Sequence, residues 1–195
     1  IEAEVWPRRE VVVLERDAER AKEIIQAAIE NGPEIKLAED TGLSTTYEWV
    51  KEKREVLFKH CVSLPPDLNT KKVESFGWGS IRNLHVHACF CYRHWLSGFA
   101  FQEGYPKVVA EDYPDGAAVR PASAETHRPV ERVLEHVKDN LDDPISGKVS
   151  WQEEPFVATP RKLLMHAVTQ EYHHKGQIVS LSRQQGYPAG DTDLL

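Results

Sequence analysis

The sequence predicts an all-α protein, a four-helix bundle with a long connection between helices two and three and a short N-terminal extension. Four stretches between residues 45 and 186 repeat apolar side chains at the spacing of helices that bury one face. The segment 102–123, between the second and third stretches, is interrupted by Pro106, Pro114 and Pro121, which favours a long connection. Four helices joined in this way are typical of a bundle and not of an α/β sheet.

The first forty residues differ in pattern from the rest, so the bundle domain is expected over 41–195. The stretch EVVVLERD (10–17) resembles a short strand. A helix is expected to follow, with Asp17 as its N-cap and Gly32 as its stop. The role of residues 1–40 does not follow from their sequence.

The first two bundle helices are expected on either side of Pro65–Pro66. Helix one spans 45–64, because the two prolines end it and four apolar residues lie near one stripe, namely Tyr47, Val50, Val56 and Leu57. Helix two follows Ser80, a good N-cap, and extends through the stretch that ends at Phe101. Its stripe consists of Ile81, Leu84, Cys91 and Trp95.

The last two bundle helices are separated by a short excursion. Helix three is expected within 123–143, on the apolar series Val130, Val133, Leu134 and Val137. Residues 145–160 alternate between apolar and polar side chains and are flanked by turn residues, which predicts a small extended or hairpin excursion. Helix four follows Thr159 as cap and ends at Gly186, and Gly176 inside it suggests a close helix approach.

Composition limits the classes of function. A net charge of −7 and a sequence pI of about 5.7, with scattered Lys and Arg, argue against nucleic-acid binding. No apolar run is long enough to cross a bilayer, and the N-terminus lacks a signal peptide's apolar region, so we expect a cytoplasmic protein with no membrane partner. The three cysteines are expected to be reduced, buried packing residues.

Metal-ligand side chains recur on helices two and four. His166, Gln170 and His174 are each four residues apart, which places them along one face of a helix. On helix two, His87 shares the stripe of Leu84 and Cys91 and is the inward-facing choice, whereas His85 points elsewhere. Side chains that project inward from facing helices are how bundles build metal sites.

The stretches SIRNLHVHACFCYRHWL and KLLMHAVTQEYHHKGQIVSLSRQQGYPAGDTDLL resemble helices two and four of the DinB/YfiT-like family of metal-dependent enzymes. The likeness covers roughly residues 45–195. It implies a DinB-like four-helix bundle, usually a homodimer, with a divalent metal, zinc or nickel, held by three histidines. Carried onto this chain, the ligands fall on His87, Gln170 and His174.

Gln170 departs from the family's pattern, because an amide oxygen is a weaker donor toward zinc or nickel than imidazole. Three outcomes stay open: ligation by Gln170, substitution by His166 or His173, or loss of the metal site with the fold retained. Cys91 lies four residues after His87 and is a further candidate. His173 and Glu171 are expected mainly to be solvated, with orientation of a ligand or proton transfer as the alternative.

The function predicted is a metal-dependent transferase or hydrolase acting on a small molecule, and relatives suggest a low-molecular-weight thiol such as bacillithiol or mycothiol. Three protein ligands would leave an open position for water or substrate. No residue is assigned a catalytic role. The alternative is a non-catalytic, stress-related binding protein that keeps the bundle without tight metal binding. Whether Gln170 permits tight metal binding decides between these two functions.

Overall fold

The computed structural model describes residues 42–74, 76–106, 108–136 and 140–193. The chain divides into two units, residues 1–40 and 41–195, and every element below belongs to the second. The strand and helix predicted within residues 1–40 lie outside the described residues.

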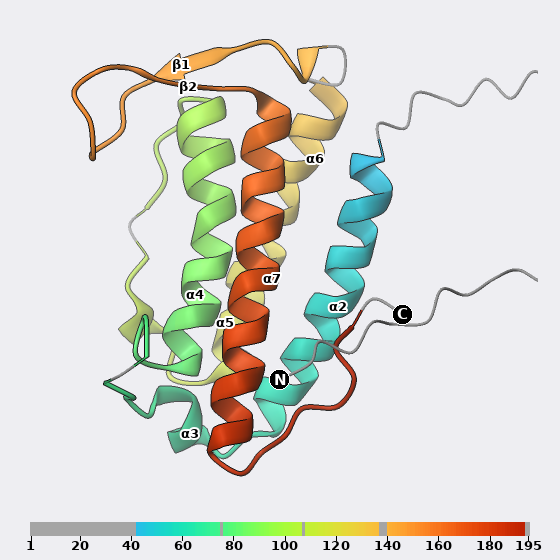
Figure 1. The fold of residues 1–195 in the computed structure, drawn as a ribbon, viewed down its shortest axis with the longest axis vertical. Coiled ribbons are helices and arrows are strands. Elements are labelled where there is room, and N and C mark those ends of the chain that lie inside the picture. The colour runs from blue at the N-terminus through green and yellow to red at the C-terminus, as the bar shows by residue number, and fades with distance from the viewer. Residues whose placement is uncertain (1–41, 75, 107, 137–139, 194–195) are drawn as a thin grey trace, which may run out of the picture. The chain divides into compact units, whose positions relative to one another are not determined.

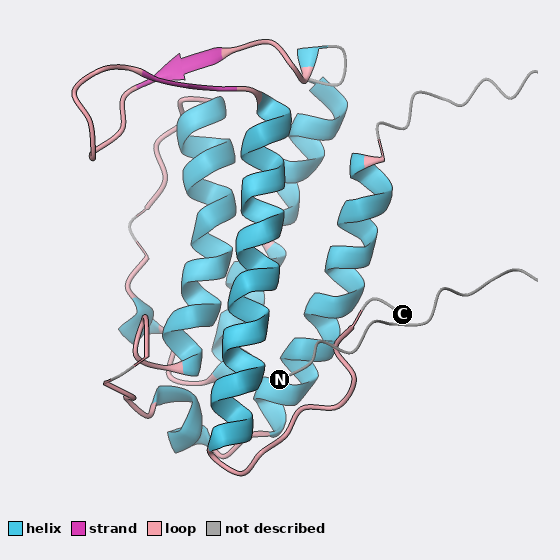
Figure 2. Ribbon diagram, viewed as in Figure 1, coloured by secondary structure: helices cyan, strands magenta, loops and turns pink. Residues whose placement is uncertain are grey.

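The second unit is a four-helix bundle, which confirms the predicted fold class (Figures 1 and 2). Two of its sides are the long helices α2 (Leu43–Ser63) and α7 (Pro160–Gln184). A third side is α4 (Ile81–Tyr92), continued by η1 (Arg93–Ala100), and the fourth is formed by α5 (Gly116–Ala124) followed by α6 (His127–His136). The short helices α3 (Pro66–Thr70) and η2 (Ala110–Asp112) lie in the connections.

The predicted helix caps are present in the structure. The Ser80 hydroxyl accepts a hydrogen bond from the backbone N–H of Asn83 at the start of α4, and Thr159 does the same for Lys162 at the start of α7. Gly186 follows α7 with a left-handed φ of 90°, the conformation that ends many helices. These local signals therefore set where α4 and α7 begin and where α7 ends.

Helix α5 corrects the prediction that 102–123 is a connection throughout. The Asp115 carboxylate accepts a hydrogen bond from the backbone N–H of Ala118, so α5 begins with an N-cap. Val119 is fully buried. Gly116 lets α5 approach α2, because a Cβ there would lie 3.1 Å from the Cys61 carbonyl oxygen. Tertiary packing holds this segment helical even though Pro121 lies inside it.

The second bundle helix changes its winding after Tyr92. Over η1 it has π geometry, and the Phe101 N–H donates to the Leu96 carbonyl five residues earlier. This change was not predicted. It keeps Leu96 and Phe99 buried, and Phe99 in turn lies against Gly147.

The predicted hairpin is confirmed as β1 (Ile145–Gly147) and β2 (Phe156–Ala158). The strands are antiparallel, with Ile145 opposite Ala158 and Gly147 opposite Phe156. They lie at the end of the bundle where η1 ends and α7 begins (Figure 1).

Helices α4 and α7 lie side by side and run in opposite directions (Figure 1). Near one end of the pair, Leu84 and Ile178 share a fully buried cluster, and near the other end Leu96 and Leu164 share a second one. Gly176 of α7 is exposed with open space around it, so the expected close helix approach at this glycine was wrong.

Candidate metal site

The antiparallel packing of α4 and α7 brings His87 and His174 into contact. Their ring centroids are 4.8 Å apart, with the planes nearly perpendicular at 86°. One imidazole therefore comes from each helix, as metal sites in helical bundles require.

His174 is held in the form that binds metals. It is 3 % exposed, and its Nδ1–H donates to the Gln177 amide oxygen at 2.7 Å. Its Nε2 is buried, and no partner for it exists within the described ranges. Burial lowers the pKa of His174, so the ring is neutral near pH 7. A neutral imidazole whose other nitrogen is hydrogen-bonded is the usual state of a metal-ligating histidine. Gln177 was not singled out in the sequence.

His87 lies between His174 and the indole of Trp78. The Trp78 ring stacks on it with centroids 3.8 Å apart, and the Cys91 sulfur is 4.0 Å from its Nε2. Burial and the neighbouring His174 lower the pKa of His87 to about 4, so this ring is also neutral near pH 7.

Trp78 forms one wall of an open cleft beside His87. Its backbone is left-handed (φ 63°), a conformation that costs energy for a bulky residue, and its carbonyl accepts a hydrogen bond from the Asn83 side chain. The indole is 54 % exposed. The cleft has a volume of about 430 Å³, and its apolar lining consists of Trp78, Val86, Phe90, Val108, Val109 and Ala110.

The other predicted ligands, Gln170, His166 and His173, differ in burial and in contacts. Gln170, one turn before His174, is half-buried, and its amide has no hydrogen-bond partner in the described part of the chain. His166 lies against Trp95, with ring centroids 5.2 Å apart, and His173 is exposed. Within the described ranges no three His, Cys, Asp or Glu residues are close enough together to hold an ion as they stand.

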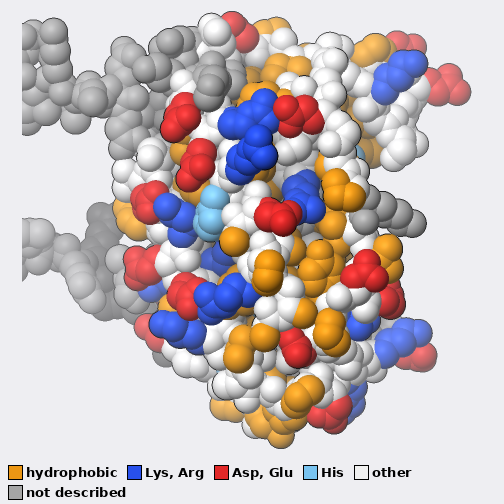
Figure 3. Space-filling model, turned by 180° about the vertical axis from the view of Figure 1, so that it is seen from behind, with side chains coloured by type: hydrophobic (Ala, Val, Ile, Leu, Met, Phe, Trp, Pro, Cys, Tyr) orange, Lys and Arg blue, Asp and Glu red, His pale blue; other side chains and the backbone are white. Residues whose placement is uncertain are grey.

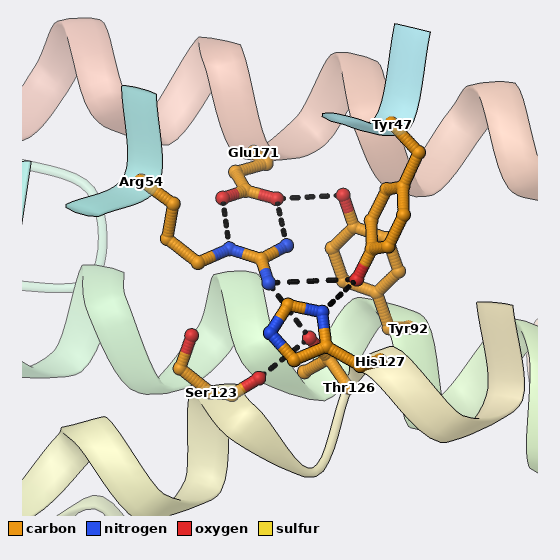
Figure 4. Close-up of polar contacts among 7 residues, drawn as sticks. All are labelled: Tyr47, Arg54, Tyr92, Ser123, Thr126, His127 and Glu171. Atoms are coloured by element: carbon orange, nitrogen blue, oxygen red, sulfur yellow. Dashed lines mark hydrogen bonds and ion pairs between the residues drawn. The ribbon is translucent and has the colours of Figure 1, made fainter. Parts of the chain in front are cut away.

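Glu171 is not a solvated surface residue, which corrects the expectation for it. Its carboxylate accepts two hydrogen bonds of 2.6 Å from the Arg54 guanidinium and one of 2.6 Å from the Tyr92 hydroxyl (Figure 4). Arg54 is 8 % exposed and also donates to Thr126. Arg54 takes a core position of α2, and a pattern of apolar residues could not reveal it.

The same network continues to His127. The Tyr47 hydroxyl lies 2.8 Å from His127 Nδ1 and within 3.5 Å of Arg54 Nη1 (Figure 4). Burial raises the pKa of Tyr92 well above its usual value, and the Glu171 carboxylate adds to this. Tyr92 therefore stays protonated and donates to Glu171. The network joins α2, α4, α6 and α7, and its hydrogen bonds among these residues do not include His87 or His174.

His85 is more buried than His87, contrary to the expectation that only His87 faces inward. It is 4 % exposed and stacks on Phe58 of α2 with ring centroids 4.8 Å apart. It lines a cavity of about 20 Å³ together with Arg54 and Glu171. Residues two apart on a helix face different neighbours, so His85 points to α2 and His87 to α7.

All three cysteines are free, as expected. Cys61 and Cys91 are buried, and Cys89 is half-buried. Burial raises the pKa of Cys91 to about 11, so its sulfur carries a proton near pH 7 when nothing is bound to it.

The charges on the face opposite to that of Figure 1 are mixed. Lys and Arg side chains alternate with Asp and Glu over this face, and no large patch of one sign is visible (Figure 3). None of the helices in the described ranges combines the length and the apolar character of a membrane span.

Comparison with known proteins places the chain in a family. No curated protein gives a significant match to the sequence. The family model described as "DinB family" matches residues 38–195, which includes the whole bundle and both histidines of the pair. The chain therefore belongs to the DinB family.

Proposed function

We propose that this chain is a metal-dependent enzyme of the DinB type, in which His87 and His174 hold a divalent metal and Gln170 assists them. The observation that carries the proposal is the Nε2 of His174. It is buried without a hydrogen-bond partner in the described part of the chain and lies on a ring that faces His87. A buried polar atom left without a partner is costly, and a metal ion would remove that cost.

Zinc or nickel suits this pair, because both ions bind imidazole well. When bound, such an ion lowers the pKa of a coordinated water or thiol and so supplies a nucleophile near neutral pH. Gln177 holds the His174 ring in place, and Trp78 packs against the His87 ring. The cleft beside His87 gives a small molecule access to the site.

The reaction proposed is that of a transferase or hydrolase, with a low-molecular-weight thiol as one candidate substrate. A thiol fits the proposal because metals activate thiols by removing their proton. The homodimer implied by the resemblance and the cytoplasmic location expected from the sequence stay predictions.

Elemental analysis of the purified chain tests metal binding. We expect near-stoichiometric zinc or nickel in the natural sequence and its loss in His174→Ala. His166→Ala is the matched control, because His166 lies on the same helix but contacts Trp95, and it should retain the metal. Equal metal contents in the natural chain and in His174→Ala would overturn the proposal.

A second candidate function is supported by one observation. The described residues bring no third His, Cys, Asp or Glu close enough to complete a site as they stand, and Gln170 is a neutral donor. This favours a non-catalytic binding protein that keeps the bundle. If only Gln170→His holds a metal, this second function takes the lead.

A further inference from the structure

The cleft beside His87 has the size of a small-molecule pocket and an apolar surface built from three segments of the chain. Its volume is about 430 Å³, and pockets that hold small molecules usually measure about 300–1,000 Å³. Helix α4 contributes Val86 and Phe90, which lie one turn apart, and the loop before α4 contributes the indole of Trp78. The connection that follows η1 runs back beside α4 (Figure 1) and adds the segment 108–110.

The apolar side chains of this cleft are anchored in the hydrophobic core. Val86 is 6 % exposed and belongs to a buried cluster with Phe58 and Val119. Val108 and Ala110 pack against the same cluster. Because side chains packed in this way keep their positions, a ligand meets a surface that already has its shape. A preformed surface of this kind lowers the cost of binding.

Trp78 is held in an exposed position by the loop around it. The Val73 N–H donates to the Gly79 carbonyl at 2.7 Å, and the Asn83 side chain donates to the Trp78 carbonyl at 2.9 Å. The indole stays 54 % exposed on a left-handed backbone, although burial of so large a ring would be favourable. Strained residues of this kind are often found where proteins hold ligands. An apolar molecule that covered the indole would supply the missing burial.

The polar side chains of the cleft already have partners within the protein. The Asn83 amide donates to the Trp78 carbonyl, and its oxygen accepts a hydrogen bond of 3.2 Å from Arg82. The Glu111 carboxylate lies 3.7 Å from the Arg82 guanidinium. Glu111 is the one charged side chain among the described residues that line the cleft. Together with the net charge of −7, it disfavours an anionic ligand.

We propose that the cleft binds a small, neutral, planar aromatic molecule that packs against the indole of Trp78. A helix of a partner protein, about 10–12 Å wide with about 5.4 Å per turn, would fill this volume with roughly one turn, which is too little for a stable interface. The inference goes beyond the proposed function and does not require a metal. An enzyme would hold its substrate there beside His87, and a binding protein would hold its ligand there.

Titration of the full chain with phenylnaphthylamine, a neutral dye that fluoresces in apolar surroundings, tests the inference. We expect saturable binding, both in the chain as purified and with EDTA added. Trp78→Ala should weaken binding at least about fivefold. Val109→Lys should weaken it as well, because it puts a charge into the apolar lining at a position that is 39 % exposed and tolerates lysine. Trp49→Ala is the matched control, because Trp49 is 50 % exposed on α2, away from the residues that line the cleft.

Several outcomes would overturn the inference. The first is a natural chain without saturable binding, and the second is equal binding by Trp78→Ala and Trp49→Ala. Anilinonaphthalene sulfonate carries the same rings with a negative charge, so its tighter binding would contradict a neutral ligand. A third is a lower apparent mass of Trp78→Ala in gel filtration with unchanged dye binding, since the indole would then contact a second copy of the chain.

The same titration separates the inference from the proposed function. Dye binding that persists in EDTA, in a chain that holds no metal, would support the inference and overturn the metal-dependent enzyme. Metal binding without dye binding would have the opposite meaning.

Discussion

Replacing Glu171 by glutamine should destabilise the bundle far more than replacing Glu55 by glutamine, although each carboxylate binds an arginine through two hydrogen bonds. The Arg54–Glu171 bonds are both 2.6 Å, and the side chains are 8 % and 13 % exposed. The Arg120–Glu55 bonds are 2.8 and 2.9 Å, and the side chains are 50 % and 42 % exposed. The geometry is therefore similar and the burial is not.

The magnitude follows from the contacts of the two carboxylate oxygens. Oε1 of Glu171 accepts from Arg54, and Oε2 accepts from both Arg54 and Tyr92. Glutamine can keep its oxygen at the Oε2 position, but its NH₂ group then replaces Oε1 and faces the Arg54 Nε–H. One charge-assisted hydrogen bond of about 1.5–3 kcal/mol is lost and the other two lose their charge, which together gives roughly 3–6 kcal/mol. Breaking a buried ion pair by removing one partner costs about 3–5 kcal/mol, which agrees. The Arg120–Glu55 pair lies in water, which screens its charges, so its contribution to stability is small.

Urea denaturation followed by tryptophan fluorescence measures both costs. We expect a lower midpoint for Glu171→Gln at an unchanged m-value and almost no shift for Glu55→Gln. A double variant, Arg54→Met with Glu171→Leu, should recover much of the loss, because it removes both buried charges. Equal small costs at Glu171 and Glu55 would refute the reasoning.

Three further predictions concern other parts of the bundle. Gly176→Ala should raise the free energy of unfolding by about 0.5–1 kcal/mol, because the site is helical and open; a decrease in urea denaturation would contradict this. Gly98→Ala should destabilise by about 1–3 kcal/mol, because its Cβ would collide with the Tyr105 ring, and a neutral result would show that the ring moves freely. Burial, and then the charge of Arg54, lower the pKa of His127, so the unfolded chain takes up the proton first as pH falls below about 6.5. Its contribution to stability is therefore present above about pH 6.5 and lost as pH falls, and His127→Gln should lose less stability than the natural chain between about pH 7.5 and 5.5.

The elements of the bundle that local signals mark were the ones predicted correctly. Ser80 and Thr159 each accept a hydrogen bond from a backbone N–H three residues later, and Gly186 follows the last turn of α7. These helix boundaries therefore depend on residues close in the sequence. Helix α5 was missed because Pro106, Pro114 and Pro121 in the segment 102–123 suggested a loop, and only packing against α2 shows otherwise.

The candidate site was predicted in part. Apolar spacing indicated His87 on one helix, and the resemblance to the DinB-like family indicated His174 on the other; the structure brings the two rings into contact, and their role as metal ligands stays a prediction. The roles of Gln177 and Trp78 depend on side-chain directions and on a loop conformation, which spacing does not specify. Arg54 and Glu171 lie 117 residues apart in the sequence, and nothing local to either predicts that they meet.

The pairing of Arg54 with Glu171 also orders events during synthesis of the chain. Arg54 lies in the first helix of the bundle and Glu171 in the last, so the guanidinium emerges from the ribosome long before its partner exists. Until then a core position of α2 carries a charge that cannot be buried cheaply. We therefore expect that incomplete chains do not form the bundle, and that it folds only once α7 has been synthesised. A fragment that ends before α7 should stay unfolded and be a target for proteases.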